Sequence, residues 1–329
     1  MPFEILTFES RALRNNFAGD PHVREVWVYL PPSYATSNRR FPVLYCLPAF
    51  GSTGAQIAVG NPWSPGMVHR FDTVIGAGAP EVIAVFPNCF TRFGGSQYLN
   101  SVALGSYEDY VCDELVPFVD TKLRTLASRD SRAVFGHSSG GYGALCLSMK
   151  RPEVFGAFAC HSGDMGFAFC YVPDFANCAD HLIRAGSIET WVERFDARAK
   201  KCGSDFDVVN VLAMAAAYSP NLELPHGLEL PFDLSSGELS PQVWQRWQSH
   251  DPVNMAGGHA DALRSMRLAF FDCGTRDELH LHLGLQLMHR RLNEIGVPHE
   301  LETFDDGHRS LGYRHDIVIP KLASALCSN

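Results

Sequence analysis

The sequence predicts an α/β fold, in which a mainly parallel central sheet is flanked by helices and carries an inserted helical cap. Short apolar runs alternate with helix-like segments over residues 41–160 and again over residues 267–327, which is typical of strand–helix–strand units. Between these parts, from roughly residue 164 to 262, helical pieces alternate with proline-rich loops instead. We therefore expect a single domain, residues 1–329, with a cap insertion at roughly 164–262.

The strands can be assigned in order along the chain. Residues 3–10 and 23–30 show strand-like patterns and should pair as an antiparallel edge. Residues 41–47 form a continuous apolar run, as in a strand that is covered on both faces, and lead into the loop Pro48–Gly54. The later buried strands are expected at 82–86, 133–135, 155–160, 267–273 and 299–304.

Helical spacing of apolar residues predicts the connecting helices. One helix should begin near Ser106 with a weak capping box and kink at Pro117. The other expected helices are 139–150, 188–201, 207–218, 278–295 and 313–327. Right-handed crossovers between parallel strands would place a site at the C-terminal ends of the strands.

Composition and charge restrict the partners of the chain. Its 329 residues are 46% hydrophobic and 19% charged, as in an ordinary globular protein. With 27 basic and 36 acidic residues the net charge is −9, and the longest basic cluster is Lys200–Lys201, so nucleic acid is not an expected partner. No apolar run reaches ~18 residues, and Glu4 stands where a signal peptide is basic, so we expect no membrane partner and no secretion.

The ten cysteines also favour a cytoplasmic protein. They are scattered, several fall in predicted core strands, and no CxxC pair indicates a metal or redox site. Reduced thiols are typical of the cytoplasm. Cys170, Cys178 and Cys202 lie nearer the surface by pattern, and a disulfide among them is left open.

The strongest local motif is Gly136-His137-Ser138-Ser139-Gly140, which fits GxSxG at a strand-to-helix junction. A serine on so sharp a turn takes a strained backbone, and glycines two residues away let strand and helix approach closely. The same turn aims the backbone N–H of Ser139, at a helix N-terminus, toward an oxyanion formed at Ser138. The alternative is a glycine-rich turn with a purely structural role.

A serine hydroxyl needs a base, and the base needs a carboxylate that holds it in one tautomer. His308 lies directly after the last predicted strand, and we expect it to be the base rather than a surface histidine. For the acid, Asp277 follows strand 267–273, although aspartate there could simply cap a helix. Its rivals are Asp272, which we expect to hydrogen-bond the loop after its strand, and Asp164, which follows the strand after the nucleophile.

The segment 164–262 is rich in aromatic side chains. These could line an acyl pocket, or they could pack the core of the segment itself, which is the expectation for any single one of them. The residues are Phe167, Phe169, Tyr171, Trp191, Trp244 and Trp247.

Neither a metal nor another cofactor is expected. His280, His282 and His289 lie near one another in sequence, but the first two should point apart on a helix. Acyl transfer through a serine needs no cofactor.

Several motifs together resemble the putative-esterase family of α/β-hydrolases, which includes esterase D (S-formylglutathione hydrolase), feruloyl esterases and mycolyltransferases. The resemblance covers about residues 41–159 and 267 to the C-terminus, but not the cap. It implies an α/β-hydrolase fold, the catalytic triad Ser138, Asp277 and His308, and a second oxyanion N–H at Phe50. The motifs are LPAFGSTG (47–54), YEDYVCDELVPFVD (107–120), GHSSGGYGAL (136–145), DCGTRDE (272–278) and DGHRS (306–310).

The chain departs from this family pattern at the oxyanion loop. Ala49 replaces a glycine and no histidine precedes it, which a backbone donor tolerates if the φ of Ala49 is negative. The cysteine found beside the oxyanion residue in esterase D is also missing, which argues against a glutathione thioester substrate.

The expected function is that of a serine carboxylesterase acting on a small-molecule ester through an acyl-enzyme. Acyl transfer to an alcohol, thioester hydrolysis of the S-formylglutathione hydrolase type, and a non-catalytic binding role are the alternatives. A homo-oligomer is compatible with the sequence. The residues expected to contact substrate are Gly51, His137, Asp164 and Trp244.

Overall fold

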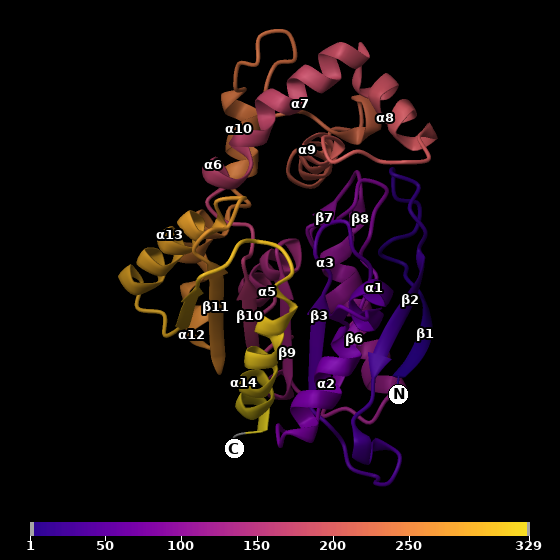
Figure 1. Cartoon of the computed structure of the whole chain (residues 1–329), viewed down its shortest axis with the longest axis vertical. Coiled ribbons are helices and arrows are strands. Elements are labelled where there is room, and N and C mark those ends of the chain that lie inside the picture. Colours follow the sequence, from indigo (N-terminus) through magenta and orange to yellow (C-terminus); the bar gives the residue numbers. More distant parts are fainter. Residues whose placement is uncertain (1–2, 328–329) are drawn as a thin grey trace.

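The structure, a computed structural model, describes residues 3–327 and is organised around an eight-stranded sheet (Figure 1). The first two strands pair antiparallel, as does the second with β6, and every later neighbour pair is parallel. Both the predicted fold class and the antiparallel edge are therefore confirmed. The strands, in spatial order, are β1 (Phe3–Glu9), β2 (Val23–Tyr29), β6 (Ile83–Phe86), β3 (Val43–Leu47), β9 (Arg132–His137), β10 (Ala157–His161), β11 (Leu268–Gly274) and β12 (Glu300–Phe304).

Helices cover both faces of this sheet, which is why its central strands are apolar throughout. On one face α2 (Met67–Gly76) and α14 (His315–Cys327) pack against Phe135 and Phe270. On the other face α5 (Ser139–Lys150) and α13 (Leu281–Glu294) belong to a second and larger apolar core. The sheet thus lies between two cores, and its C-terminal edge stays available for a site.

The segment before the elbow, which is the sharp strand-to-helix turn Gly136–Gly140, differs from the prediction in two details. Helix α3 (Tyr107–Asp109) passes into a π-helical turn over Tyr110–Leu115 and then into α4 (Val116–Lys122). The predicted kink at Pro117 is thus a change of helix type, because proline cannot continue the α-helical hydrogen bonds of the preceding turn. The side chain of Ser106 accepts no capping hydrogen bond, so the predicted capping box is wrong.

Residues 164–262 form a helical segment, most of which lies beyond the end of the sheet where β10 leads into α6 (Figure 1, upper part). Of the six aromatic side chains named in the sequence analysis, Phe167, Tyr171, Trp191 and Trp247 are buried, Trp244 is half-buried and Phe169 is 38% exposed. They pack mainly against neighbours in the same segment, as expected for any single one. The helices are α6 (Phe167–Cys170), α7 (Val172–Ala185), α8 (Ile188–Ala197), α9 (Asp205–Tyr218), α10 (Pro241–Gln248), α11 (Pro252–Met255) and α12 (Ala260–Arg264).

Short elements near the sheet edge complete the fold. Helix α1 (Gly54–Val59) is followed by a tight hairpin of β4 (Gly60–Asn61) and β5 (Ser64–Pro65), and a second small ribbon pairs β7 (Asn100–Ser101) with β8 (Gly105–Ser106).

Within residues 3–327, every helix is too short or too polar to cross a bilayer. All ten cysteines are free thiols, and Cys170 and Cys178, predicted nearer the surface, are buried.

Candidate active site

Ser138 sits on a strained turn between β9 and α5. Its φ and ψ are +57° and −126°, in a region that residues with a Cβ rarely occupy. The flanking glycines are required by close packing: a Cβ on Gly136 would lie 2.6 Å from the Leu47 oxygen, and one on Gly140 only 2.1 Å from it. The elbow is thus locked against β3, and the hydroxyl of Ser138 is held at the end of the sheet.

Two residues distant in sequence meet Ser138 at this point. The Nε2 atom of His308 lies 3.0 Å from Ser138 Oγ, and its Nδ1 atom lies 2.8 Å from Asp277 Oδ2. All three side chains are largely shielded from solvent. His308 comes from the loop after β12 and Asp277 from the loop after β11, so the three groups converge because their parallel strands end at one edge.

Asp277 is held as a carboxylate that orients His308. Burial alone would raise the pKa of Asp277, but the hydrogen bond and charge of His308, with the Leu279 and Leu281 N–H groups, hold it below its ordinary value. A carboxylate accepts from Nδ1–H, which leaves Nε2 of the neutral imidazole as an acceptor for the Ser138 hydroxyl. The arrangement can therefore remove the proton of Ser138.

The two rival aspartates have other partners. Asp164 Oδ2 accepts from Gln97 Nε2 at 3.0 Å and from the Tyr171 hydroxyl at 2.9 Å, with Ser139 Oγ at 3.5 Å. Burial raises the pKa of Asp164, although these hydrogen bonds oppose it. Asp164 thus lies beside the start of α5 and joins it to the helical segment.

Asp272 was expected to hydrogen-bond the loop after its strand, and this prediction is wrong. Its Oδ1 lies 2.7 Å from His161 Nδ1 and its Oδ2 accepts from Arg314 Nε at 2.9 Å. The loop cannot compete because the Asp272 side chain is buried on the face covered by α14, where His161 and Arg314 supply charged or polar donors. Asp272 is therefore paired below the site rather than with His308.

The two backbone N–H groups expected to stabilise an oxyanion belong to the loop after β3 and to the start of α5. Within residues 3–327 the N–H groups of Phe50 and Ser139 donate to no protein acceptor. By contrast, the next amide of the loop, that of Gly51, donates to the Gly94 oxygen at 2.8 Å, and Gly51 has a φ of +75° that favours glycine. The Phe50 ring packs on Gly94 and edge-on to Phe206 at 5.8 Å, which anchors this loop.

His137 lies beside His308 and lines a cavity of about 320 Å³. Its ring centroid is 4.6 Å from that of His308. Burial and the nearby charges of His308 and His161 lower the pKa of His137 to about 3, so its imidazole is neutral. Its Nε2 atom is buried without a partner in the described chain. Ala49, Gln56, Asn61, Ser64, Arg70, Ser310 and His315 are among the other residues that line the cavity.

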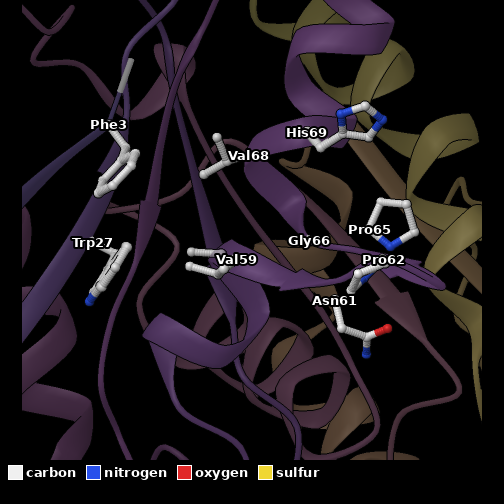
Figure 2. A pocket seen from close by; sticks show the side chains of 10 residues that line it. Phe3, Trp27, Val59, Asn61, Pro62, Pro65, Gly66, Val68 and His69 are labelled. Carbon is white, nitrogen blue, oxygen red and sulfur yellow. The ribbon is translucent and has the colours of Figure 1, made fainter. Parts of the chain in front are cut away.

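A second cavity, of about 420 Å³, is mainly apolar, and like the first it is lined by none of the three converging residues (Figure 2). Phe3 and Trp27 lie on one side of it and Val59 and Val68 face them. Trp244 lines neither of these two cavities. It lies on α10 and packs against Phe175 and Trp247, so the structure does not bring it to the converging residues.

The histidines considered as metal ligands do not form such a site. Within residues 3–327, no group of three or more His, Cys, Asp or Glu side chains is arranged to hold a metal ion. His280 precedes α13 and its ring lies 6.3 Å from that of His282. His289 instead hydrogen-bonds His299, with 2.8 Å between Nδ1 and Nε2.

Sequence reasoning missed one contact to His308. The Glu278 carboxylate accepts the backbone N–H of His308, which ties the histidine loop to the loop that carries Asp277. The one feature of the sequence that points to Glu278 is its position directly after Asp277. That position does not reveal a hydrogen bond to His308, which lies thirty residues later. Helix α13 was expected to begin at Glu278 but begins at Leu281, because His280 has a φ of +59°.

Comparison with known proteins places this geometry in context. A family model described as "Putative esterase" matches residues 21–318. An esterase of Mycobacterium tuberculosis strain H37Rv is 28% identical over 165 residues, which are 48% of this chain and 34% of that protein. The match therefore spans about a third of the length of that relative.

Solved structures with similar folds cover nearly the whole chain. A ferulic acid esterase has a TM-score of 0.62 at 19% identity, covering 98% of this chain and 99% of that one. An S-formylglutathione hydrolase from Agrobacterium tumefaciens has a TM-score of 0.62 at 16% identity, covering 98% and 95%. These likenesses show an α/β-hydrolase fold, as the resemblance in sequence implied.

Proposed function

Because this chain belongs to the putative esterase family, we propose that it is a serine carboxylic-ester hydrolase that forms an acyl-enzyme on Ser138. One observation carries the proposal. An unbroken hydrogen-bonded series runs from Ser138 Oγ to His308 Nε2 at 3.0 Å and from His308 Nδ1 to Asp277 Oδ2 at 2.8 Å. The same three residue types in this series activate serine in other hydrolases.

In the first half of the reaction, Ser138 Oγ attacks the ester carbonyl carbon while His308 Nε2 takes its proton. The carbonyl oxygen becomes an oxyanion, and the N–H groups of Phe50 and Ser139 donate to it. Asp277 stabilises the imidazolium. The tetrahedral intermediate then collapses, the bond to the alkoxy oxygen breaks, and His308 gives its proton to the departing alcohol.

In the second half, water replaces the alcohol. His308 takes a proton from water, whose oxygen attacks the acyl carbon, and the same two N–H groups hold the second oxyanion. Collapse breaks the bond to Ser138 Oγ, which recovers its proton from His308. One ester and one water thus give one acid and one alcohol, with no cofactor.

We place the leaving group beside His308, because that imidazole must protonate it. The cavity of about 320 Å³ is lined by His137 and by Ser310 of the His308 loop, but by none of Ser138, Asp277 and His308, so it does not hold the reacting atoms. The substrate that we propose is a small or medium ester, including an aryl ester. We also propose that residues 164–262 act as a cap, because Asp164 joins Tyr171 of that segment to the start of α5.

Ser138→Ala tests the proposal directly. It should abolish hydrolysis of p-nitrophenyl acetate and labelling by a fluorophosphonate probe, with the fold intact by circular dichroism. Ser148→Ala is the matched control, because Ser148 is a buried serine of α5 whose hydroxyl has no partner in the described chain. Wild-type hydrolysis by Ser138→Ala would disprove the acyl-enzyme.

Acyl transfer to an alcohol is a second candidate, because an acyl-enzyme on Ser138 can react with either nucleophile. Water and alcohol compete for the same acyl-enzyme. Product analysis with added glycerol or sugar acceptors distinguishes them, because a transferase yields mainly the new ester. A panel of acyl lengths, with feruloyl and S-formylglutathione substrates, would then identify the preferred acyl group and leaving group.

A further inference from the structure

Below the converging residues, a row of ionisable side chains crosses four neighbouring strands. The parallel register aligns His137 with His161, His161 with Asp272, and Asp272 with Glu302. His161 and Asp272 are buried, and Asp272 lies 2.7 Å from His161 Nδ1. Buried ionisable groups at matching positions of a sheet are costly unless they are paired, so their partners matter.

One guanidinium completes this row. Arg314 Nε donates to Asp272 Oδ2 at 2.9 Å and its Nη2 donates to Glu302 Oε2 at 2.6 Å. The Arg314 side chain is only 8% exposed. Burial alone would lower the pKa of Arg314, but its hydrogen bonds with Glu302 and Asp272 hold it above its ordinary value, so it stays charged. The arginine therefore joins β11 to β12.

The same guanidinium also borders both ends of the loop that carries His308. The loop leaves β12 at Phe304, and the Arg314 guanidinium carbon lies 4.3 Å from the centroid of that ring. The loop ends in the short helix that contains Arg314 itself, Leu311–Arg314. Tyr313 of this helix also contacts the loop, because its hydroxyl donates to Asp306 Oδ2 at 3.0 Å. A displacement of Arg314 would therefore move the base of the loop at two points.

We propose that Arg314 is a positioning residue, whose guanidinium holds both ends of the His308 loop and so keeps the imidazole within reach of Ser138. The inference rests on the proposed serine-esterase function. Arg314 touches no reacting atom, and acts by fixing the 3.0 Å separation of His308 Nε2 from Ser138 Oγ. A displacement of ~1 Å in such a geometry costs on the order of 10²-fold in rate.

Substitution should lower kcat rather than substrate binding. For Arg314→Ala we expect kcat to fall by ~10–100-fold with little change in KM, and fluorophosphonate labelling of Ser138 to slow in parallel. Arg314→Lys should keep an intermediate rate, because an ammonium keeps the charge but cannot bridge two carboxylates with a planar fork. Millimolar guanidinium should restore part of the kcat of Arg314→Ala, because it refills the vacated site.

Arg132→Gln is the matched control for loss of a buried ion pair. Arg132 is also 8% exposed and bonds Asp120 at 2.8 Å, but it lies at the opposite end of β9 from Ser138. The Arg132→Gln variant should have a lower Tm than wild type and a kcat within ~3-fold of the wild-type value. An Arg314→Ala kcat equal to that of this control would overturn the proposal, as would a loss that neither lysine nor guanidinium relieves.

A second experiment, by proton NMR, tests the position of His308 without measuring hydrolysis. In wild type, the Nδ1 proton that His308 shares with Asp277 should give a downfield proton resonance, and Arg314→Ala should broaden or abolish it. If wild type shows this resonance, Arg314→Ala loses it and neither protein hydrolyses an ester, the proposed function fails while the support of the His308 loop by Arg314 stands. If Arg314→Ala leaves both the resonance and kcat unchanged, the positioning role fails while the esterase function stands.

Discussion

The elbow makes the clearest quantitative prediction, through Gly140→Ala. A Cβ at this position would lie 2.1 Å from the Leu47 carbonyl oxygen, 2.9 Å from its carbon and 3.0 Å from the Pro48 oxygen. These are backbone atoms, so no side chain can rotate away. Ordinary contact begins at 3.4 Å, and the first of these distances is about 1.3 Å short of it. Helix α5 and the end of β3 must therefore separate by roughly an ångström.

The separation of α5 from β3 would displace both the nucleophile and one expected oxyanion donor. It moves Ser138 relative to His308, and it moves the loop after Leu47, which carries Phe50. A misplacement of ~1 Å costs on the order of 10²-fold in rate, and overpacking costs about 1–3 kcal/mol of stability. We expect kcat/KM of Gly140→Ala for p-nitrophenyl acetate to fall by at least ~100-fold, with a lower Tm.

Gly76→Ala is the appropriate control. Gly76 ends α2 and faces open space, so a Cβ there meets nothing within 4 Å. That variant should keep wild-type activity and be as stable or slightly more stable, because alanine lowers the entropy of the unfolded chain. Wild-type kcat/KM in folded Gly140→Ala would refute the argument that close strand–helix contact holds the nucleophile in place.

Two further predictions concern charge. Asp277→Asn should lower kcat by about 10³–10⁴-fold, because an amide can no longer favour the required tautomer of His308. A larger loss in Asp164→Asn, measured with the same ester, would contradict this choice of acid. Burial and the Lys150 charge lower the pKa of His250 to about 4. Between pH ~6.5 and ~4 the unfolded chain therefore binds more protons than the folded protein, and the free energy of unfolding falls as the pH falls. From pH 7 to pH 5, His250→Gln should therefore lose less free energy of unfolding than wild type, by about 1–2 kcal/mol in urea titrations; equal losses would argue against it.

The elements that could be predicted are those with a local cause. The apolar runs of β3, β9 and β10 are visible because each strand is covered on both faces. The predictions failed at element ends, where a single contact or dihedral angle decides. Examples are the π-helical turn before Pro117 and the late start of α13 after His280.

Contacts between side chains distant in the sequence could be predicted only where both residues follow strands of the parallel sheet. Asp277 and His308 could be selected because both follow strands of a parallel sheet, whose ends meet at one edge. Nothing in the spacing of Asp272 reveals its pairing with His161 and Arg314, which depends on strand order and register. Trp244 was chosen for its residue type alone, and its neighbours proved to be other aromatic rings of the helical segment.

By itself, then, the sequence determined the α/β class, the strained serine turn and the family, because backbone conformation and burial pattern depend on residues close together in the chain. Only the tertiary structure decided which carboxylate faces His308, which backbone N–H groups stay unoccupied, and which arginine joins the strands beneath. Those choices depend on distances of a few ångströms between residues that lie apart in the sequence, by 12 positions for Glu302 and Arg314 and by 170 for Ser138 and His308, and such distances are set by the packing of the whole sheet.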